Sequence, residues 1–456
     1  MTFKGRSLHF IGIGGAGMSG LALVAHALGA RVTGSDRADS PYCASLRDAG
    51  IDPVIGHDAA NLPAGAEVVV STAIPDDNPE LSAARSAGAR VLHRADLLGE
   101  LSRLKRTIAV SGTHGKTTTA SMATHVLRAT GRDPAFLIGG ELRSAGTNAE
   151  WGSGEWAVVE ADESDRSFLK LDREVAVVTN IELDHHSTYA SLGELEEAFA
   201  EFAAPAAVRV LGPGVDLDGE AVRFGIDEGE LRATRVELTA GGSRFDVDAI
   251  PVELGVPGRH NVLNALAALG ACRVAGVDPD EAAPALAGFT GAGRRFEAHG
   301  RGRSGALVYD DYAHHPTEVR ATLEAARLMA HQGGGRLVAC FQPHLYSRTR
   351  LLAREFGRAL GLADLVVVVD VYPARERPED FPGVSGLLVA QAAADAAGGR
   401  PVWWLPEMLD AERMLSAELR PGDLLLTLGA GDVDRLARAL GGEDTPAPAL
   451  GGEGAQ

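Results

Sequence analysis

Short apolar runs alternate with longer helical stretches along the first hundred residues. Residues 8–13, 30–34 and 67–71 are mostly apolar or small, whereas residues 18–28 repeat apolar side chains at helical spacing. Such alternation is typical of βαβ units, in which helices connect the parallel strands of one sheet. The pattern predicts an N-terminal Rossmann-like α/β domain over residues 1–102.

Two further stretches repeat this alternation. In the first, apolar runs at 107–110, 155–160 and 175–180 surround a helical segment, and a β-rich stretch at 208–256 precedes an Ala/Leu helix at 261–275. In the second, strand-like runs at 307–309, 336–341, 365–371, 401–405 and 424–428 alternate with helical segments at 316–330, 353–361 and 384–397. The chain is therefore predicted to be α/β throughout. We expect a central P-loop ATPase-like domain with a parallel or mixed sheet at 103–296 and a C-terminal Rossmann-like domain at 297–440.

Composition fits this multidomain picture. At 456 residues the chain exceeds the size at which one core usually keeps growing, and 45% hydrophobic with 23% charged residues is ordinary for a globular protein. The formal charge of −19 argues against a nucleic-acid partner. The segment at 441–456, rich in Gly, Pro and Ala, is predicted to be disordered.

Cysteine usage and hydropathy indicate the compartment. Cys43, Cys272 and Cys340 are odd in number and lack metal-ligand spacing, so we expect reduced thiols that act as small core residues. The N-terminal residues resemble no signal peptide, and no apolar run is long enough to span a bilayer. We expect a cytoplasmic protein without membrane insertion.

Residues 110–119, Val-Ser-Gly-Thr-His-Gly-Lys-Thr-Thr-Thr, read as a phosphate loop. They follow an apolar strand and open a helix, the setting in which backbone N–H groups surround a polyphosphate. Lys116 would place a charge at the β- and γ-phosphates, and the Thr117 hydroxyl would be a ligand for Mg²⁺. Val110 stands where the general motif has glycine. The stretch predicts use of ATP.

A second glycine-rich turn occurs earlier, at residues 12–17. Its spacing matches G-x-G-x-x-G, and Asp36 follows the next strand where a ribose-binding acid would lie. Alone, this motif would fit an NAD-dependent oxidoreductase. The alternative is that these glycines only permit close packing of helix and strand.

Acidic residues and a histidine pair follow two central strands. The run Glu160-Ala-Asp-Glu-Ser-Asp165 directly follows one strand, so its first carboxylate can face the phosphate loop and hold Mg²⁺. The alternative is a solvated acidic turn. His185 lies beside Asp184 and His186 and could bind a ligand or cap a helix.

Asn261 and Asn264 open a helix at i and i+3. Amides on one helix face can read an adenine edge through paired donors and acceptors. Asn261 could equally be a helix cap, whereas Asn264 already lies inside the helix.

Two polar clusters follow C-terminal strands. The first contains Asp310, Tyr312 and His314, and the second His344 and Arg348. Arginine suits bidentate recognition of a carboxylate, although Arg350 in the same stretch could be a surface ion-pair group.

Together these motifs resemble the Mur ligase family over residues 8–432. The resemblance rests on the stretches 12–20, 71–80, 112–119, 160–165, 180–185, 258–264, 294–296, 310–318 and 341–349. The resemblance also accounts for Val110, because the family's own loop, Gly-Thr-x-Gly-Lys-Thr, departs from the general phosphate-loop motif in the same way. Within the family the motifs are most similar to the branch that joins L-alanine to UDP-N-acetylmuramate.

The resemblance implies a role for each candidate residue. The UDP-sugar would be bound by Gly12, Gly14, Gly15, Gly17, Met18, Ser19, Asp36 and Ser71. ATP would be bound by Gly112, Thr113, His114, Gly115, Lys116, Thr117, Thr118, Asn261, Asn264, Arg295 and Asp310, the last at the ribose. Mg²⁺ would be held by Thr117, Glu160 and His185, and the amino-acid region would be formed by Tyr312, His344 and Arg348. Catalysis would depend on Lys116, Glu160, His185, His314, His344 and Arg348.

The implied activity is ATP-dependent amide-bond formation through an acyl phosphate, with small-molecule substrates and a monomer or homodimer. Two departures stand out: residues 185–205 lack the lysine that sister ligases carbamoylate, and Leu345 stands where some members have arginine. The alternatives are a murein peptide ligase acting on the same sugar nucleotide, an NAD-dependent dehydrogenase, and a nucleotide-binding regulator without catalysis.

Overall fold

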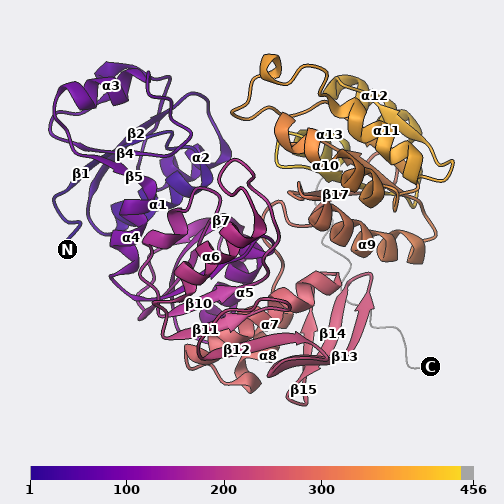
Figure 1. Cartoon of the computed structure of the whole chain (residues 1–456), viewed down its shortest axis with the longest axis horizontal. Coiled ribbons are helices and arrows are strands. Elements are labelled where there is room, and N and C mark those ends of the chain that lie inside the picture. The colour runs from indigo at the N-terminus through magenta and orange to yellow at the C-terminus, as the bar shows by residue number, and fades with distance from the viewer. Residues whose placement is uncertain (1, 443–456) are drawn as a thin grey trace. The chain divides into compact units, whose positions relative to one another are not determined.

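The computed structural model describes residues 2–442, which form three β-sheets connected by helices (Figure 1). The N-terminal sheet has five parallel strands in the order β3-β2-β1-β4-β5. Its elements are β1 (Ser7–Ile11), α1 (Ala16–Ala27), β2 (Arg31–Asp36), α2 (Pro41–Asp48), β3 (Val54–Ile55), η1 (Ala59–Asn61), β4 (Glu67–Val70), α3 (Pro79–Ser86), β5 (Val91–His93) and α4 (Arg94–Ser102). Strand order reverses between β1 and β4, which is where open α/β sheets bind ligands.

The central sheet is mixed. The strands run in the order β12-β11-β10-β6-β9-β7-β8, and β13, β14 and β15 continue it beyond β12. The strands are β6 (Arg106–Ser111), β7 (Ala135–Leu142), β8 (Thr147–Glu150), β9 (Trp156–Glu160), β10 (Val175–Val178), β11 (Val208–Leu211), β12 (Ala221–Ile226), β13 (Leu231–Thr239), β14 (Gly242–Val247) and β15 (Ile250–Leu254). The helices are α5 (Lys116–Ala129), η2 (Ser167–Lys170), α6 (Leu192–Ala203), α7 (Arg259–Val274) and α8 (Pro279–Ala287). β6 has β9 and β10 as parallel neighbours, so the loops after these three strands meet at one edge.

The C-terminal sheet has the order β16-β17-β21-β18-β19-β20, with β16 antiparallel. Its strands are β16 (Glu297–Arg301), β17 (Leu307–Asp311), β18 (Leu337–Phe341), β19 (Leu365–Val368), β20 (Val402–Trp404) and β21 (Leu424–Leu428). Its helices are α9 (Pro316–Gln332), α10 (Tyr346–Leu360), η3 (Pro378–Asp380), α11 (Gly386–Ala396), α12 (Met408–Glu418) and α13 (Asp434–Leu440). Every residue of β18 is buried, as expected for a parallel strand covered on both faces.

Two compact units divide the described chain. The first holds residues 2–234, 246–250 and 263–289, and the second holds 235–245, 251–262 and 290–442. Within the first unit one hydrophobic core joins the N-terminal and central sheets and includes Phe10, Phe168 and Val178. The second unit has its own core around Phe341 and Phe356.

The predicted three-domain α/β architecture is confirmed, but one helix start was wrong. α10 begins at Tyr346, not at 353, because Leu345 turns the chain at φ 68° and its carbonyl accepts from the N–H of Thr349. The polar run after Leu345, which precedes the predicted helix at 353–361, is the first turn of this helix. All three cysteines are free and buried, as predicted.

The boundaries at 102/103 and 296/297 stay predictions, and the predicted disordered tail lies outside the described residues from 443 onward. Among residues 2–442, none of the helices combines the length and apolar character needed to cross a bilayer.

Candidate active site

The phosphate loop at 110–119 connects β6 to α5. Gly112 and Gly115 have φ values of 128° and 82°. A β-carbon on Gly112 would lie 2.0 Å from Thr179 Oγ1, and one on Gly115 would lie 2.3 Å from Asn264 Oδ1. The loop therefore requires glycine at both positions. The N-cap of α5, Gly115, makes no side-chain capping hydrogen bond, and the first turn carries no acidic residue, an arrangement that suits an anion at this helix end.

Lys116 lies inside the loop and is already paired. Its Nζ donates to the carbonyls of Gly112 and Thr113 at 2.7 and 3.1 Å, and lies 2.9 Å from Glu163 Oε2. Burial alone would lower the pKa of Lys116, but Glu163 and Asp162 outweigh it and hold that pKa above its usual value. Lys116 is therefore a fixed ammonium at the place where phosphate would bind.

Thr117 and Glu160 meet as the sequence predicts. The Thr117 hydroxyl donates to Glu160 Oε1 at 3.0 Å, and Glu160 Oε2 accepts from the N–H of Gly139 at 2.7 Å. A β-carbon on Gly139 would lie 2.8 Å from Glu160 Oε2, so this glycine makes room for the carboxylate. A hydroxyl and a carboxylate beside a phosphate loop are hard oxygen donors, which fits Mg²⁺.

Glu163 is the residue at this site that sequence reasoning missed. Its carboxylate is fully buried and lies between Lys116 and His185, whose Nε2 is 3.3 Å from Glu163 Oε1. The Tyr189 hydroxyl donates to the backbone carbonyl of Glu163 at 2.7 Å. His185, predicted as a metal ligand, is thus anchored to an acid, at a φ of 53°. Glu163 lies in the acidic run already noted, but nothing in that run distinguishes it from its neighbours.

The loop after β10 closes over the phosphate loop. Asn180 Oδ1 accepts from the N–H of His114 at 2.9 Å, and its Nδ2 donates to the His114 carbonyl at 3.0 Å. The Thr113 hydroxyl donates to the carbonyl of Glu182 at 2.9 Å. His114 and Thr113 therefore shape the loop, while Thr118 is buried beneath it.

The two asparagines of α7 have different surroundings. Asn264 Oδ1 is 3.3 Å from the Thr119 hydroxyl and packs against Gly115, so it reaches the phosphate loop. Asn261 Nδ2 donates to the carbonyl of Pro257 at 2.7 Å, which ties the helix start to the preceding chain. Their adenine contact stays a prediction.

The first glycine turn, residues 12–17, connects β1 to α1. Asp36 Oδ2 accepts from the N–H of Gly14 at 2.9 Å, so this carboxylate shapes the turn itself. A β-carbon on Gly14 would lie 2.7 Å from Cys43 Sγ and 3.0 Å from Ser40 Oγ. Gly14 is thus required by close packing with α2.

Met18 and Ser19 point into the protein. Met18 belongs to the core, and the Ser19 hydroxyl donates to the carbonyl of Ala16 at 3.0 Å. Ser71 is half-buried at the end of β4 and accepts from the N–H of Ala73 at 3.4 Å. Contact of these three with a sugar nucleotide stays a prediction, and Met18 and Ser19 would make it through the backbone.

In the second unit, two aspartates end β17. Asp310 is fully buried, accepts from Arg294 Nε at 2.9 Å and is 2.6 Å from the Thr427 hydroxyl. Asp311 accepts from the N–H groups of Phe296 and Ala313, both at 2.8 Å. Burial raises the pKa of Asp310, and raises that of Asp311 to about 6. For Asp310 to make the predicted contact with the ribose, its ion pair with Arg294 would have to open.

The residues predicted for the amino-acid region lie together in this unit. The rings of Tyr312 and His314 are 5.3 Å apart, and those of His314 and His344 are 5.8 Å apart. Arg348 Nη1 lies 3.5 Å from His344 Nδ1, and Arg295 lies 5.1 Å from the Tyr312 ring centroid. Aromatic rings and cations thus form one continuous cluster, which suits recognition of a carboxylate.

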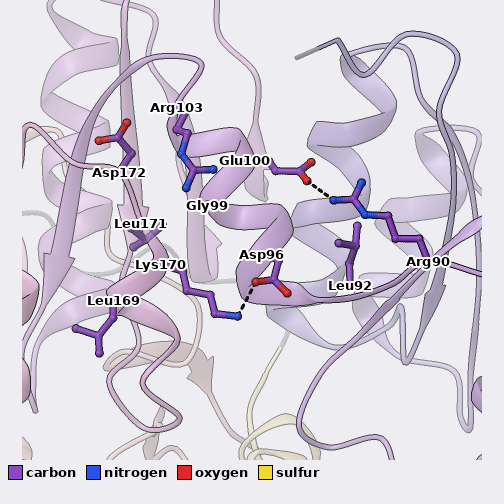
Figure 2. A pocket seen from close by; sticks show the side chains of 10 residues that line it. All are labelled: Arg90, Leu92, Asp96, Gly99, Glu100, Arg103, Leu169, Lys170, Leu171 and Asp172. Carbon is purple, nitrogen blue, oxygen red and sulfur yellow. Dashed lines mark hydrogen bonds and ion pairs between the residues drawn. The ribbon is translucent and has the colours of Figure 1, made fainter.

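A separate cavity of about 630 Å³ lies beside α4, away from these residues. Figure 2 shows its charged walls, where Lys170 pairs with Asp96 at 2.5 Å and Arg90 with Glu100 at 3.1 Å. None of the predicted site residues lines it. Because these opposite charges already satisfy one another, the cavity offers no chemistry comparable to the phosphate loop.

Comparison with known proteins decides the family. Residues 7–106 match the Mur ligase family catalytic domain, 110–272 the Mur ligase middle domain, and 294–431 the Mur ligase glutamate ligase domain. The chain is also 48% identical to a UDP-N-acetylmuramate–L-alanine ligase from Rubrobacter xylanophilus, over 95% of this chain and 99% of that relative. This chain belongs to the Mur ligase family.

Other relatives agree with that membership. A UDP-N-acetylmuramate–L-alanine ligase from Acidithiobacillus ferrooxidans is 46% identical over 95% of this chain and 96% of its own. Among solved structures, the UDP-N-acetylmuramate–alanine ligase of Thermotoga maritima matches with a TM-score of 0.83 at 30% identity, over 95% and 98% of the two chains. A murein peptide ligase from Psychrobacter arcticus matches at 0.73 and 25%, over 97% and 100%. The Mur ligase architecture thus covers nearly the whole chain.

Proposed function

We propose that this Mur ligase joins L-alanine to the lactyl carboxylate of UDP-N-acetylmuramate at the expense of ATP and with Mg²⁺, in the cytoplasm. The support is twofold: relatives named for this reaction align over nearly the full length, and the phosphate loop that carries Lys116 and Thr117 meets Glu160 from the end of β9. The geometry of that loop is the observation that carries the ATP-dependent part.

A carboxylate is a poor electrophile because its charge repels an attacking amine. Transfer of the γ-phosphoryl group makes an acyl phosphate: a carboxylate oxygen bonds to phosphorus, the bond to the bridging oxygen breaks, and ADP leaves. The alanine amine then bonds to the acyl carbon, loses a proton, and expels inorganic phosphate. Both steps depend on positioning and charge stabilisation rather than on a protein nucleophile.

The residues of the phosphate loop fit the first step. Lys116 would exchange its contacts with Glu163 and the loop carbonyls for phosphate oxygens, while Glu163 and Asp162 keep it protonated. Thr117 and Glu160 would hold Mg²⁺, which when bound offsets the negative charge of the phosphates. Asn264, beside Gly115, would lie next to the nucleotide.

The cluster formed by Tyr312, His314, His344 and Arg348 would bind the amino-acid side of the reaction. Arg348 is a fixed cation suited to the carboxylate of alanine. Leu345 lies just before it in the chain, so one arginine would serve where some relatives have two.

The test is ADP release by the purified full-length protein with UDP-N-acetylmuramate, ATP, Mg²⁺ and each of several amino acids. We expect release that requires the sugar nucleotide and is fastest with L-alanine. A murein peptide ligase would instead prefer a tripeptide as acceptor, so L-Ala-γ-D-Glu-meso-diaminopimelate belongs in the same assay. ATP binding without substrate-dependent ADP release would refute the proposal.

A further inference from the structure

Arg94 lies where a ligand of the N-terminal sheet would bind. It is the first residue of α4 and follows β5 directly, as the first glycine turn follows β1 and Ser71 follows β4. β1, β4 and β5 are parallel neighbours, so these three loops share one edge of the sheet. That edge contains the switch point between β1 and β4, where open α/β sheets bind ligands.

Helix stability does not explain an arginine at this position. A cation in the first turn opposes the helix dipole, which favours negative charge there. Asp96 already supplies that charge, and it closes a capping box with His93. The contacts of Arg94 must therefore lie outside its own helix.

The guanidinium of Arg94 is only half used. Its Nη2 reaches Asp165 Oδ2 at 3.2 Å and Asp162 Oδ2 at 3.5 Å, while Nε and Nη1 have no hydrogen-bond partner among residues 2–442. Nη1 would lie 3.3 Å from a β-carbon on Gly17, so it rests against the first turn of α1. The side chain is 20% exposed. Nη1 thus lies against the first glycine turn, and neither it nor Nε has a hydrogen-bond partner among the described residues.

Two other arginines of the N-terminal sheet show the contacts that a purely structural arginine makes in this domain. Arg6 uses Nε and Nη2 on Glu67 and Nη1 on Glu100, at 2.6–2.9 Å. Arg90, at the opposite end of β5, contacts the same two glutamates and lines the cavity in Figure 2. Arg6 and Arg90 each use at least two nitrogens on these carboxylates, whereas both contacts of Arg94, at 3.2 and 3.5 Å, come from Nη2 alone.

We propose that Arg94 is a side-chain ligand of the sugar-nucleotide diphosphate, an inference that rests on the proposed function. The first glycine turn offers backbone N–H groups, and Arg94 adds the cation and a planar pair of donors that suit phosphate oxygens. Asp162 and Asp165 hold the guanidinium in place and compete with the diphosphate for it. The same acidic run contains Glu160 and Glu163, so Arg94 connects the sugar-nucleotide turn to the ATP site.

The experiment measures the binding of UDP and of ATP to the full-length protein by calorimetry. We expect Arg94→Gln to weaken UDP at least tenfold and to change ATP affinity less than twofold. Arg90→Gln is the matched control and leaves both affinities unchanged. Arg94→Lys, which keeps the charge but loses the paired donors, falls between wild type and Arg94→Gln.

A second variant, Asp165→Asn, distinguishes between two roles for Arg94: a ligand of the diphosphate, or one half of a structural ion pair. Asn keeps the Oδ1 that accepts from the N–H of Ser167, but removes the charge that holds Arg94. If Arg94 binds diphosphate, UDP affinity is unchanged or tighter in this variant. If Arg94 only ties the two sheets together, Asp165→Asn and Arg94→Gln weaken UDP alike, which would overturn the inference. An unaltered UDP affinity in Arg94→Gln would overturn it as well.

These measurements do not depend on turnover, so the two proposals can fail separately. A wild-type protein that binds UDP but forms no amide would refute the proposed function and leave the role of Arg94 testable. A wild-type protein that ligates alanine, with an Arg94→Gln variant that binds UDP normally, would refute the inference alone.

Discussion

The first glycine turn and the phosphate loop have the same local structure but obtain their positive charge differently. Each connects a parallel strand to a helix whose first turn has no acidic residue. The phosphate loop carries its own cation, Lys116, on the first residue of α5. The first glycine turn has none, and Arg94 reaches it from the start of α4. The cation of one site is thus encoded within the ten residues of its own loop, whereas the cation of the other comes from a distant element.

A fully buried glutamate supports each of the two regions. Glu163 lies beneath the phosphate loop and pairs with Lys116 and His185. Glu80, at the start of α3, accepts from His9 and Ser35 on the strands before and after the first glycine turn. Glu163 holds the lysine of the phosphate loop, whereas Glu80 holds strands together, so the same residue type should respond differently to substitution.

The largest expected effect comes from Lys116→Ala. Because Lys116 is the cation at the proposed γ-phosphate position, turnover should fall on the order of 10³-fold, measured as ADP release. UDP affinity should be unchanged, since the cation beside the first glycine turn is Arg94 and not Lys116. Near-normal ligation by this variant would refute the assigned role.

Stability provides the control for that variant. Removing Lys116 leaves the buried carboxylate of Glu163 without its ammonium, which we expect to cost about 3 kcal/mol. Lys116→Ala combined with Glu163→Gln should recover much of the urea midpoint without recovering activity. If the single variant is as stable as wild type, Glu163 is not held charged by Lys116.

The next effect compares one glycine from each turn. Gly115→Ala forces a side chain into φ 82° and within 2.3 Å of Asn264 Oδ1, and should cost at least about 2 kcal/mol. Gly15 has φ −75°, and its added β-carbon would lie 3.5 Å from the Gly12 carbonyl, an ordinary contact. Gly15→Ala should stay within about 0.5 kcal/mol in the same urea titration. Equal losses would mean that the two turns are equally constrained.

Metal dependence should separate the regions as well. Glu160→Gln removes a proposed Mg²⁺ ligand and should raise the Mg²⁺ concentration for half-maximal ADP release at least about tenfold. Thr117→Ser keeps the hydroxyl and is the matched control. UDP binding in Glu160→Gln should match wild type, and a parallel loss of UDP affinity would place the metal between the two substrates.

Much of the fold is predictable because its causes are local. Buried parallel strands read as continuous apolar runs, such as the one that became β18, and the helices between them follow from periodicity. The start of α10 is not predictable in this way, because Tyr346 and the polar residues after it resemble a loop. The turn at Leu345 that starts this helix is fixed by its tertiary setting.

The candidate site divides along the same line. Lys116, Thr117 and Glu160 are predictable because a short motif and a strand end place them. The partnership of Glu163 with Lys116 is not, since it spans two strands and one acid in a run of four resembles the others. The carboxylate of Asp36 accepts from the N–H of Gly14, a role that only three-dimensional packing reveals, and its contact with a ribose stays a prediction.

The last effect concerns Glu80, and its pH dependence is what distinguishes it. Burial would raise the pKa of Glu80, but hydrogen bonds from His9, Ser35 and Asn61 overcome it and lower that pKa from 4.5 to about 2. A lowered pKa means that the stabilisation is complete above pH 4.5 and is lost as the pH falls toward 2. A change of one unit in a pKa corresponds to about 1.4 kcal/mol of stability. Because His57 beside Glu80 is partly exposed to solvent, we take less than the full change and expect the charge of Glu80 to stabilise the fold by roughly 2 kcal/mol at pH 7.

Glu80→Gln tests this through the stability gap between variant and wild type, measured at several pH values. The urea midpoint of the variant should lie below that of wild type at pH 7, and the gap should close as the pH is lowered through 4.5 toward 3. The other carboxylates titrate in both proteins, so their contributions to the pH dependence cancel in this comparison. Because Glu80 holds strands and no phosphate ligand, ATP affinity at pH 7 should not change, in contrast to substitution of Glu163, which frees the phosphate-loop lysine. A stability gap independent of pH would show that Glu80 acts through packing and neutral hydrogen bonds alone, and the contrast between the two glutamates would then rest on position, not on charge.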